Sequence, residues 1–168
     1  MINISMADGL SGTYQTAVSA REMADNQKDI TVVNSRTLCG PHRYLVECAA
    51  AMAREDKTRG EILAMLEEKM RHTKSYLIPQ DFDYLRRGGR LSSTAAFVGS
   101  VLNLKPILTP NKECSRLDKF GIGRTMKGAV KAVFRQMKKD QVGKEDILYI
   151  AHGNVPGDAL AIEAMAKE

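Results

Sequence analysis

The sequence has 168 residues, of which 43% are hydrophobic, which is enough for one ordinary domain or two small ones and excludes a disordered tail. The 25 Lys and Arg residues outnumber the 20 Asp and Glu residues, so the chain attracts anions, but the net charge of +5 falls short of a dedicated nucleic-acid binder. The three cysteines have no C-x-x-C spacing, and no apolar run approaches the ~18 residues of a membrane span. These patterns exclude a disulfide framework and a zinc knuckle, and favour a cytoplasmic protein without stable membrane insertion.

The first half of the chain alternates strands with helices. A short alternating strand at 2–5 leads through a turn into a helix that ends near residue 26. The segment DITVVNS (29–35) predicts a second strand, and the next helix starts near Pro41, which suits the first helical turn. A third helix, at 58–72, begins with Thr and Glu in the spacing of a capping box. Because strand and helix alternate, a parallel sheet is favoured.

The middle of the chain contains shorter elements. KSYLIP (74–79) predicts a strand, DFDYLRRGG (81–89) a short helix that glycine ends, and SSTAAFVGSVLNL (92–104) an apolar helix capped by serine. KPILTP (105–110) and RLDKFGIG (116–123) predict two short strands. The turn between them, NKECS, lacks the usual glycine of a hairpin.

A long helix at 124–139 has two different faces. At about 100° per residue its apolar side chains fall within roughly a 100° arc. Its cations share about 80° of arc on a different face: Arg124, Lys127, Lys131, Arg135 and Lys138. Like charges repel, so this face does not stabilise the helix and is either a docking face for an anionic partner or a plain solubilising face. DILYIAHGN (146–154) then predicts a strand, and 156–168 a last helix.

These elements predict an α/β protein with two lobes. Residues 1–78 form part of a first lobe with a parallel sheet, and residues 79–168 form a second lobe with short paired strands and helices. A strand starts at residue 2 without a lead-in, and the last helix has no glycine cap, so we expect the fold to be incomplete at both ends.

The segment Ser11-Gly12-Thr13 lies where the first predicted strand leads into a helix. Free backbone N–H groups and the positive end of the helix dipole meet at such a junction, and small residues let an anion such as a carboxylate come close. A simple serine cap explains the same residues, because serine is among the commonest N-cap residues. The segment matches neither GxxxxGK[ST] nor GxGxxG, so it does not indicate a nucleotide site.

A second candidate site is the Gly88-Gly89 pair and its arginines. The two glycines predict a left-handed turn that ends the short helix and directs Arg90 outward. With Arg86 and Arg87 it forms a cationic surface, which is either a docking site or ordinary solvated charge at a helix C-terminus. No nucleophile, base and orienting group can be assembled from the sequence, so an enzyme is not indicated.

Four segments resemble, in order and spacing, the DegV family of bacterial fatty-acid-binding proteins: ISMADGLSGTYQTA, VVNSRTLCG, DFDYLRRGGRLS with GSVLNLKPIL, and LDKFGIGRT. The resemblance covers nearly the whole chain, and LSGTY with YLRRGGR and LNLKPIL is specific in combination. It implies a two-lobed carrier that holds a long-chain fatty acid between its lobes, needs no cofactor and no metal, and presents the carboxylate to a separate ATP-dependent fatty-acid kinase.

The resemblance also implies which residues act. The fatty-acid carboxylate is expected at the Ser-Gly-Thr motif: Ser11, Gly12 and Thr13. Arg90 and Arg124 look like the residues that face the kinase, and the nearby cations Arg87 and Lys127 are expected to take part in the same docking.

The sequence departs from the family pattern at several positions. Asn34 stands where the family has aspartate, and Cys114 stands in a turn that usually holds glycine. The family's Thr-Ser-x-Pro-Ser segment and its histidine-bearing Gly-rich segment, which also bind the carboxylate, do not occur in the sequence. An alternative is a regulatory protein that binds anions or nucleic acid through helix 124–139, against which the aromatic content of 5% argues.

Overall fold

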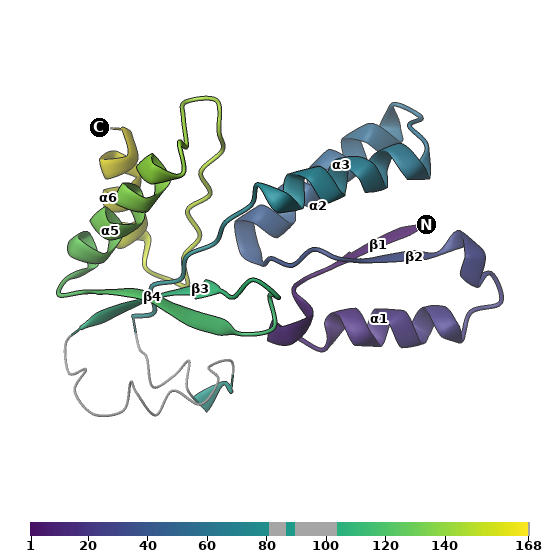
Figure 1. Ribbon diagram of the computed structural model, residues 1–168, viewed down its shortest axis with the longest axis horizontal. Helices are drawn as coiled ribbons and strands as arrows, with labels where there is room; N and C mark the ends of the chain where they lie inside the picture. Colours follow the sequence, from purple (N-terminus) through teal and green to yellow (C-terminus); the bar gives the residue numbers. More distant parts are fainter. Residues whose placement is uncertain (81–86, 90–103, 168) are drawn as a thin grey trace. The chain divides into compact units, whose positions relative to one another are not determined.

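The computed structural model describes residues 1–80, 87–89 and 104–167 (Figure 1). Contacts divide the chain into two compact units, of which the first contains Met1–Ser75 and Pro110–Arg116, and the second contains Tyr76–Thr109 and Leu117–Glu168. The assignment of residues 1–78 and 79–168 to two lobes stays a prediction. Nothing in the sequence indicates that residues 110–116 belong with the first unit.

The first unit contains a parallel pair of strands, β1 (Ile2–Ser5) and β2 (Thr31–Asn34), which pair along their whole length. Between them lie the short 3₁₀ helix η1 (Asp8–Leu10), helix α1 (Thr13–Glu22) and a second 3₁₀ helix, η2 (Gln27–Asp29). Parallel neighbours need such a crossover connection, because a tight turn would make them antiparallel. The predicted parallel sheet is therefore confirmed.

Two helices complete the first unit. α2 (Cys39–Arg54) has Pro41 in its first turn, and α3 (Arg59–Arg71) starts with the predicted capping box. Thr58 Oγ1 accepts a hydrogen bond from Glu61 N–H at 3.3 Å, and the Glu61 carboxylate accepts one from Thr58 N–H at 2.8 Å. The helices share a buried apolar core against which side chains of both strands pack. The buried members of this core are Leu45, Ala49, Ile62 and Leu66.

The second unit contains a hairpin and two helices. β3 (Lys105–Pro110) and β4 (Leu117–Gly123) form the predicted pair of strands, which is antiparallel. α5 (Met126–Lys139) follows β4 and packs on it, and α6 (Pro156–Lys167) packs against α5. This arrangement confirms an α/β protein in which the second part of the chain has short paired strands and helices.

Two predicted strands differ from the structure. KSYLIP (74–79) forms only an isolated antiparallel bridge, between Leu77 and Leu108. DILYIAHGN (146–154) forms no strand, and Ile147 within it is 60% exposed. Its apolar, β-branched composition predicts a strand, but a strand is stable only beside a neighbouring strand, and neither sheet found in the described residues includes this segment.

The helix predicted at 124–139 begins two residues later, at Met126. Thr125 takes the N-cap position, where its Oγ1 accepts a hydrogen bond from Gly128 N–H at 3.0 Å. The helix predicted at 81–89 lies outside the described residues except for 87–89, in which Gly89 has a φ of 71° and confirms the left-handed turn. The helix predicted at 92–104 lies outside them except for its last residue.

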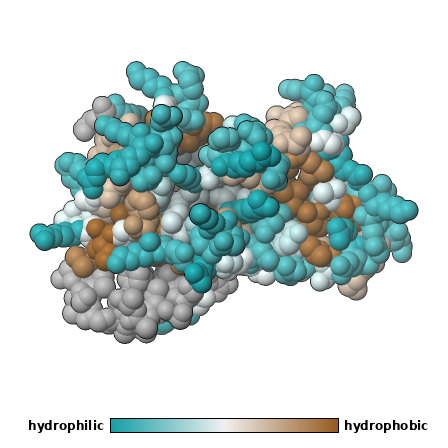
Figure 2. Space-filling view, viewed as in Figure 1, coloured by the Kyte–Doolittle hydropathy of each residue, from teal (hydrophilic) through white to brown (hydrophobic). Residues whose placement is uncertain are grey.

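Hydrophilic side chains cover most of the face shown in Figure 2, with smaller groups of hydrophobic side chains among them. The large hydrophobic side chains that are exposed to solvent include Met23, at the end of α1, and Leu160 of α6. Within the described part of the chain, every helix is too short or too polar to cross a membrane.

Candidate functional site

Ser11, Gly12 and Thr13 lie together at the start of α1. Ser11 follows η1, and Gly12, which has no side chain to cap the helix, takes the N-cap position of α1. The hydroxyl oxygens of Ser11 and Thr13 are 2.6 Å apart, and Thr13 N–H donates to Ser11 Oγ at 3.3 Å. Ser11 precedes the N-cap residue Gly12, but its hydroxyl still accepts the first N–H of the helix, so the serine cap that the sequence allows stays an alternative.

The start of α1 is open to an approaching group. Gly12 and Thr13 are exposed, and Ser11 is half-buried. A β-carbon placed on Gly12 would meet nothing within 4 Å among the residues that the structure describes. The first-turn N–H groups of a helix carry partial positive charge and have no partner within the helix. Two hydroxyls and these N–H groups are donors that suit a carboxylate.

η1, which directly precedes Ser11 in the chain, holds the site in place. Ala7, just before η1, is fully buried and donates its N–H to the Thr37 carbonyl oxygen at 2.9 Å. Ser11 N–H donates to the Ala7 carbonyl oxygen at 3.2 Å. The nearby Asp8 carboxylate would repel a bound carboxylate. It accepts a hydrogen bond from Gln15 Nε2 at 3.0 Å.

A buried polar cluster follows the carboxyl end of β2, and sequence reasoning missed it. Ser35 is 1% exposed, and its hydroxyl oxygen lies 3.0 Å from His42 Nδ1 of α2. Thr37, also buried, places its hydroxyl 3.0 Å from that of Ser75. Burial lowers the pKa of His42 below its ordinary value. No spacing in the sequence indicates this cluster, because Ser75 lies far along the chain from the others.

Of the four cations predicted to face a partner, the structure describes three. Arg87 is helical and exposed, next to the turn at Gly89. Arg124 is exposed ahead of α5, and Lys127 is exposed in its first turn. Arg90 lies outside the described residues.

The two faces predicted for α5 are confirmed by burial. The remaining cations of the basic face are exposed: Lys131, Arg135 and Lys138. The apolar side chains of the other face are buried or half-buried: Met126, Val130, Val133, Phe134 and Met137. Helices α2, α3 and α6 carry ion pairs three or four residues apart on their own surfaces, such as Arg43 with Glu47 in α2 and Glu163 with Lys167 in α6. No ion pair found in the described residues neutralises the basic face of α5.

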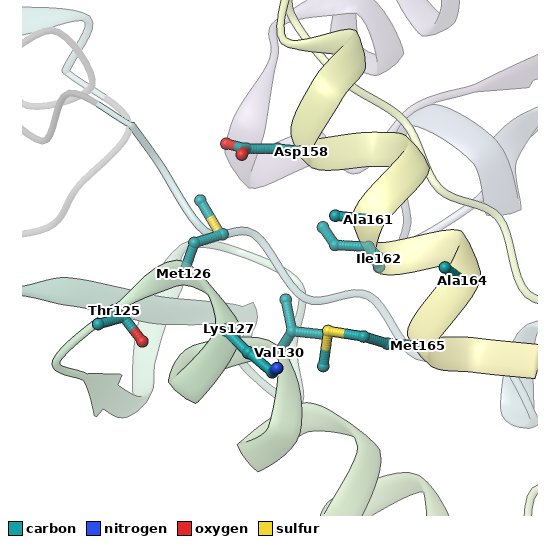
Figure 3. Close-up of a pocket in the computed structure, with 9 residues that line it drawn as sticks. All are labelled: Thr125, Met126, Lys127, Val130, Asp158, Ala161, Ile162, Ala164 and Met165. Carbon is teal, nitrogen blue, oxygen red and sulfur yellow. The ribbon is translucent and has the colours of Figure 1, made fainter. Parts of the chain in front are cut away.

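A cleft of about 520 Å³ lies between α5 and α6, and no sequence signal predicted it (Figure 3). Val130 of α5 and Met165 of α6 point toward one another across it. Asp158 stands at one side of the cleft, and its carboxylate accepts a hydrogen bond from the Gln80 side chain. Ser11 and its neighbours do not line this cleft, which the second unit forms alone.

Metal binding has no support among residues 1–80, 87–89 and 104–167. Within these ranges no three His, Cys, Asp or Glu side chains are grouped so that they could hold a metal ion. The donors at the start of α1 are hydroxyl and amide groups, which receive an anion better than a cation.

The fold and site define an α/β protein with a pair of hydroxyls at a helix start in one unit and a basic amphipathic helix in the other. The sequence model of the family described as "Uncharacterised protein, DegV family" matches residues 1–168. The chain belongs to the DegV family, as the motifs of the sequence indicate.

Individual relatives agree with this membership. A DegV domain-containing protein of Clostridium perfringens is 33% identical over 172 residues, which cover 100% of this chain and 59% of that protein. The crystal structure of DegV from Bacillus subtilis, a fatty acid binding protein, is 32% identical with a TM-score of 0.68, and covers 83% of this chain and 49% of that one. A DegV family protein from Eubacterium eligens loaded with heptadecanoic acid has the same fold, with a TM-score of 0.84 at 23% identity, covering 99% of this chain and 60% of that one. The chain thus spans between 49% and 60% of the length of these relatives.

Proposed function

We propose that this chain is part of a fatty-acid carrier in which the start of α1 receives the carboxylate of a long-chain fatty acid. The observation that carries the proposal is the pair of hydroxyls, Ser11 Oγ and Thr13 Oγ1, 2.6 Å apart at a helix start whose N-cap residue is glycine. Fatty acid binding by the Bacillus subtilis relative, which is 32% identical, supports the same class of ligand. Gly12 has no side chain and so leaves room for the head group.

The tail and the head of such a ligand contribute differently to affinity. Burying about fourteen methylene groups at ~0.8 kcal/mol each contributes roughly 11 kcal/mol. Hydrogen bonds to a charged carboxylate contribute about 1.5–3 kcal/mol each. The tail therefore dominates affinity, and the contacts at Ser11 mainly fix where the carboxylate lies.

We further propose that the protein presents this carboxylate to a separate fatty-acid kinase and is not itself the catalyst. Arg87, Arg124 and Lys127 are exposed cations that can pair with acidic side chains of a partner. Arg90 takes the same role in this proposal on the strength of the family resemblance. The carrier needs no cofactor other than the bound acid, and its free thiols suit the reducing cytoplasm.

Native mass spectrometry and titration with a C16 fatty acid test the carboxylate site. Ser11→Ala should weaken binding of the acid about 10-fold, because one hydrogen bond to a charged group is lost. Ser19→Ala is the matched control, since Ser19 is an exposed serine of the same helix away from its start. A wild-type chain that binds no long-chain acid contradicts the proposed function. A Ser11→Ala variant that binds as tightly as wild type contradicts the assignment of the site.

A further inference from the structure

The tip of the β3–β4 hairpin, residues 110–116, belongs to the first unit and lies against η1, directly before Ser11. A β-carbon placed on Gly9 of η1 would overlap the main chain of Ser115, at its Cα, carbonyl carbon and carbonyl oxygen. A side chain in the way could change rotamer, but main-chain atoms cannot turn aside. Glycine at position 9 is therefore what allows η1 and the hairpin tip to touch.

The hairpin tip is a braced structure. Asn111 Oδ1 accepts hydrogen bonds from Ser115 N–H at 2.8 Å and from Arg116 N–H at 3.3 Å. The amide nitrogen of the same side chain donates to Ser115 Oγ at 3.0 Å and to Glu113 Oε2 at 2.8 Å. A main-chain hydrogen bond from Asn111 N–H to the Arg116 carbonyl oxygen, 3.0 Å long, closes the turn. The Ser115 main chain is thus a fixed support for η1.

η1 is also tied to the rest of the first unit by buried residues and main-chain hydrogen bonds, so a shift of η1 disturbs the site. Ala7 is fully buried and bonded to the Thr37 carbonyl oxygen at 2.9 Å, and Leu10 is buried as well. Ser11 N–H is bonded to the Ala7 carbonyl oxygen at 3.2 Å. Any displacement of η1 therefore moves the Ser11 hydroxyl.

We infer that Gly9 and the hairpin tip 110–116 position the Ser11 hydroxyl for the fatty-acid carboxylate, through the contact between Gly9 and the Ser115 main chain. The inference rests on the proposed function and adds to it a support that comes from a distant part of the chain. Gly9 is a positioning residue, since it acts through Ser11.

Gly9→Ala tests this inference, with Gly60→Ala as the matched control. Gly60 lies in the first turn of α3, where a β-carbon comes no closer than 4.0 Å to another group. Each variant is titrated with a C16 fatty acid and with the C16 alcohol, which has the same tail but no carboxylate. Gly9→Ala should bind the acid about 10-fold more weakly and the alcohol as tightly as wild type, because only the head-group contacts are displaced. Gly60→Ala should change neither affinity.

A readout without ligand accompanies the titrations. The backbone amide resonances of Ser11, Gly12 and Thr13 should shift in Gly9→Ala and stay in place in Gly60→Ala. Asn111→Ala, which adds no atoms and removes the brace of the tip, should weaken acid binding about 3-fold and decides the question if Gly9→Ala does not fold.

The outcomes separate the inference from the proposed function. If the wild-type chain binds no acid, the proposed function fails and the inference fails with it. If wild type binds and the acid affinity is unchanged in both Gly9→Ala and Asn111→Ala, only the inference is overturned. An equal loss for acid and alcohol also overturns it, because that result marks a general loss of structure.

Discussion

Gly123 ends β4 just ahead of α5, and replacing it with alanine tests how closely the two elements pack. A β-carbon placed on Gly123 would lie 2.5 Å from Ala129 N and 2.7 Å from Ala129 Cα and Cβ. Ala129 is fully buried, and its N–H is bonded to the Thr125 carbonyl oxygen at 3.0 Å. The first turn of α5 must therefore move by roughly 1 Å before the new methyl group reaches ordinary contact distance.

The expected cost follows from this overlap. Inserting a methyl group into a packed site costs about 1–3 kcal/mol. Replacing glycine by alanine also stabilises the protein by about 0.4–1 kcal/mol, because alanine lowers the conformational entropy of the unfolded chain. Gly123→Ala should therefore lower the free energy of unfolding by about 1–2 kcal/mol. Gly121→Ala, two residues earlier in β4, is the matched control, because the nearest described atom to its β-carbon is Ile107 Cδ1, at an ordinary 3.7 Å.

Urea unfolding followed by far-ultraviolet circular dichroism measures the difference, since the chain has no tryptophan for fluorescence. The midpoint should fall for Gly123→Ala and should stay or rise slightly for Gly121→Ala. Equal midpoints for the two variants would refute the steric reasoning, because both carry the same chemical change in the same strand.

Three further predictions concern the first unit. Leu66→Ala should lower the free energy of unfolding by about 2–5 kcal/mol, because Leu66 is 1% exposed in the core and its loss leaves a cavity; a smaller loss in urea unfolding contradicts the packing described. Thr58→Ala should cost about 1 kcal/mol by removing the cap of α3. The Thr58 hydroxyl also donates to the Glu61 carboxylate and lowers its pKa, so this part of the difference between wild type and variant is complete above the ordinary pKa of 4.5 and is lost as the pH falls through the folded value. A difference that stays constant down to about pH 3 would contradict this. Burial lowers the pKa of His42, so the unfolded chain binds more protons and the free energy of unfolding falls as the pH drops below 6.5. His42→Asn, which can keep a bond to Ser35, should lose less of this free energy between pH 6.5 and about 5. Parallel plots of unfolding free energy against pH for wild type and variant would contradict this.

Features that depend on residues close together in the chain could be predicted from the sequence. The capping box of Thr58 and Glu61 needs only a spacing of three residues, and the two faces of α5 need only the helical period. The parallel pairing of β1 with β2 follows from the helix between them. The position of the helix start at Gly12 could also be predicted locally, because a strand followed by a Ser-Gly-Thr segment and a helix indicates where free N–H groups converge.

Features that depend on segments far apart in the sequence were decided by the tertiary structure alone. The contact of Gly9 with Ser115 and the pairing of Thr37 with Ser75 join residues that no local pattern connects. The strand expected around Ile147 fails for the same reason, since β propensity does not specify a neighbouring strand. Residue type and spacing determine which conformation a segment prefers locally. Long-range packing determines which segments contact one another, and it alone places the hairpin tip against η1.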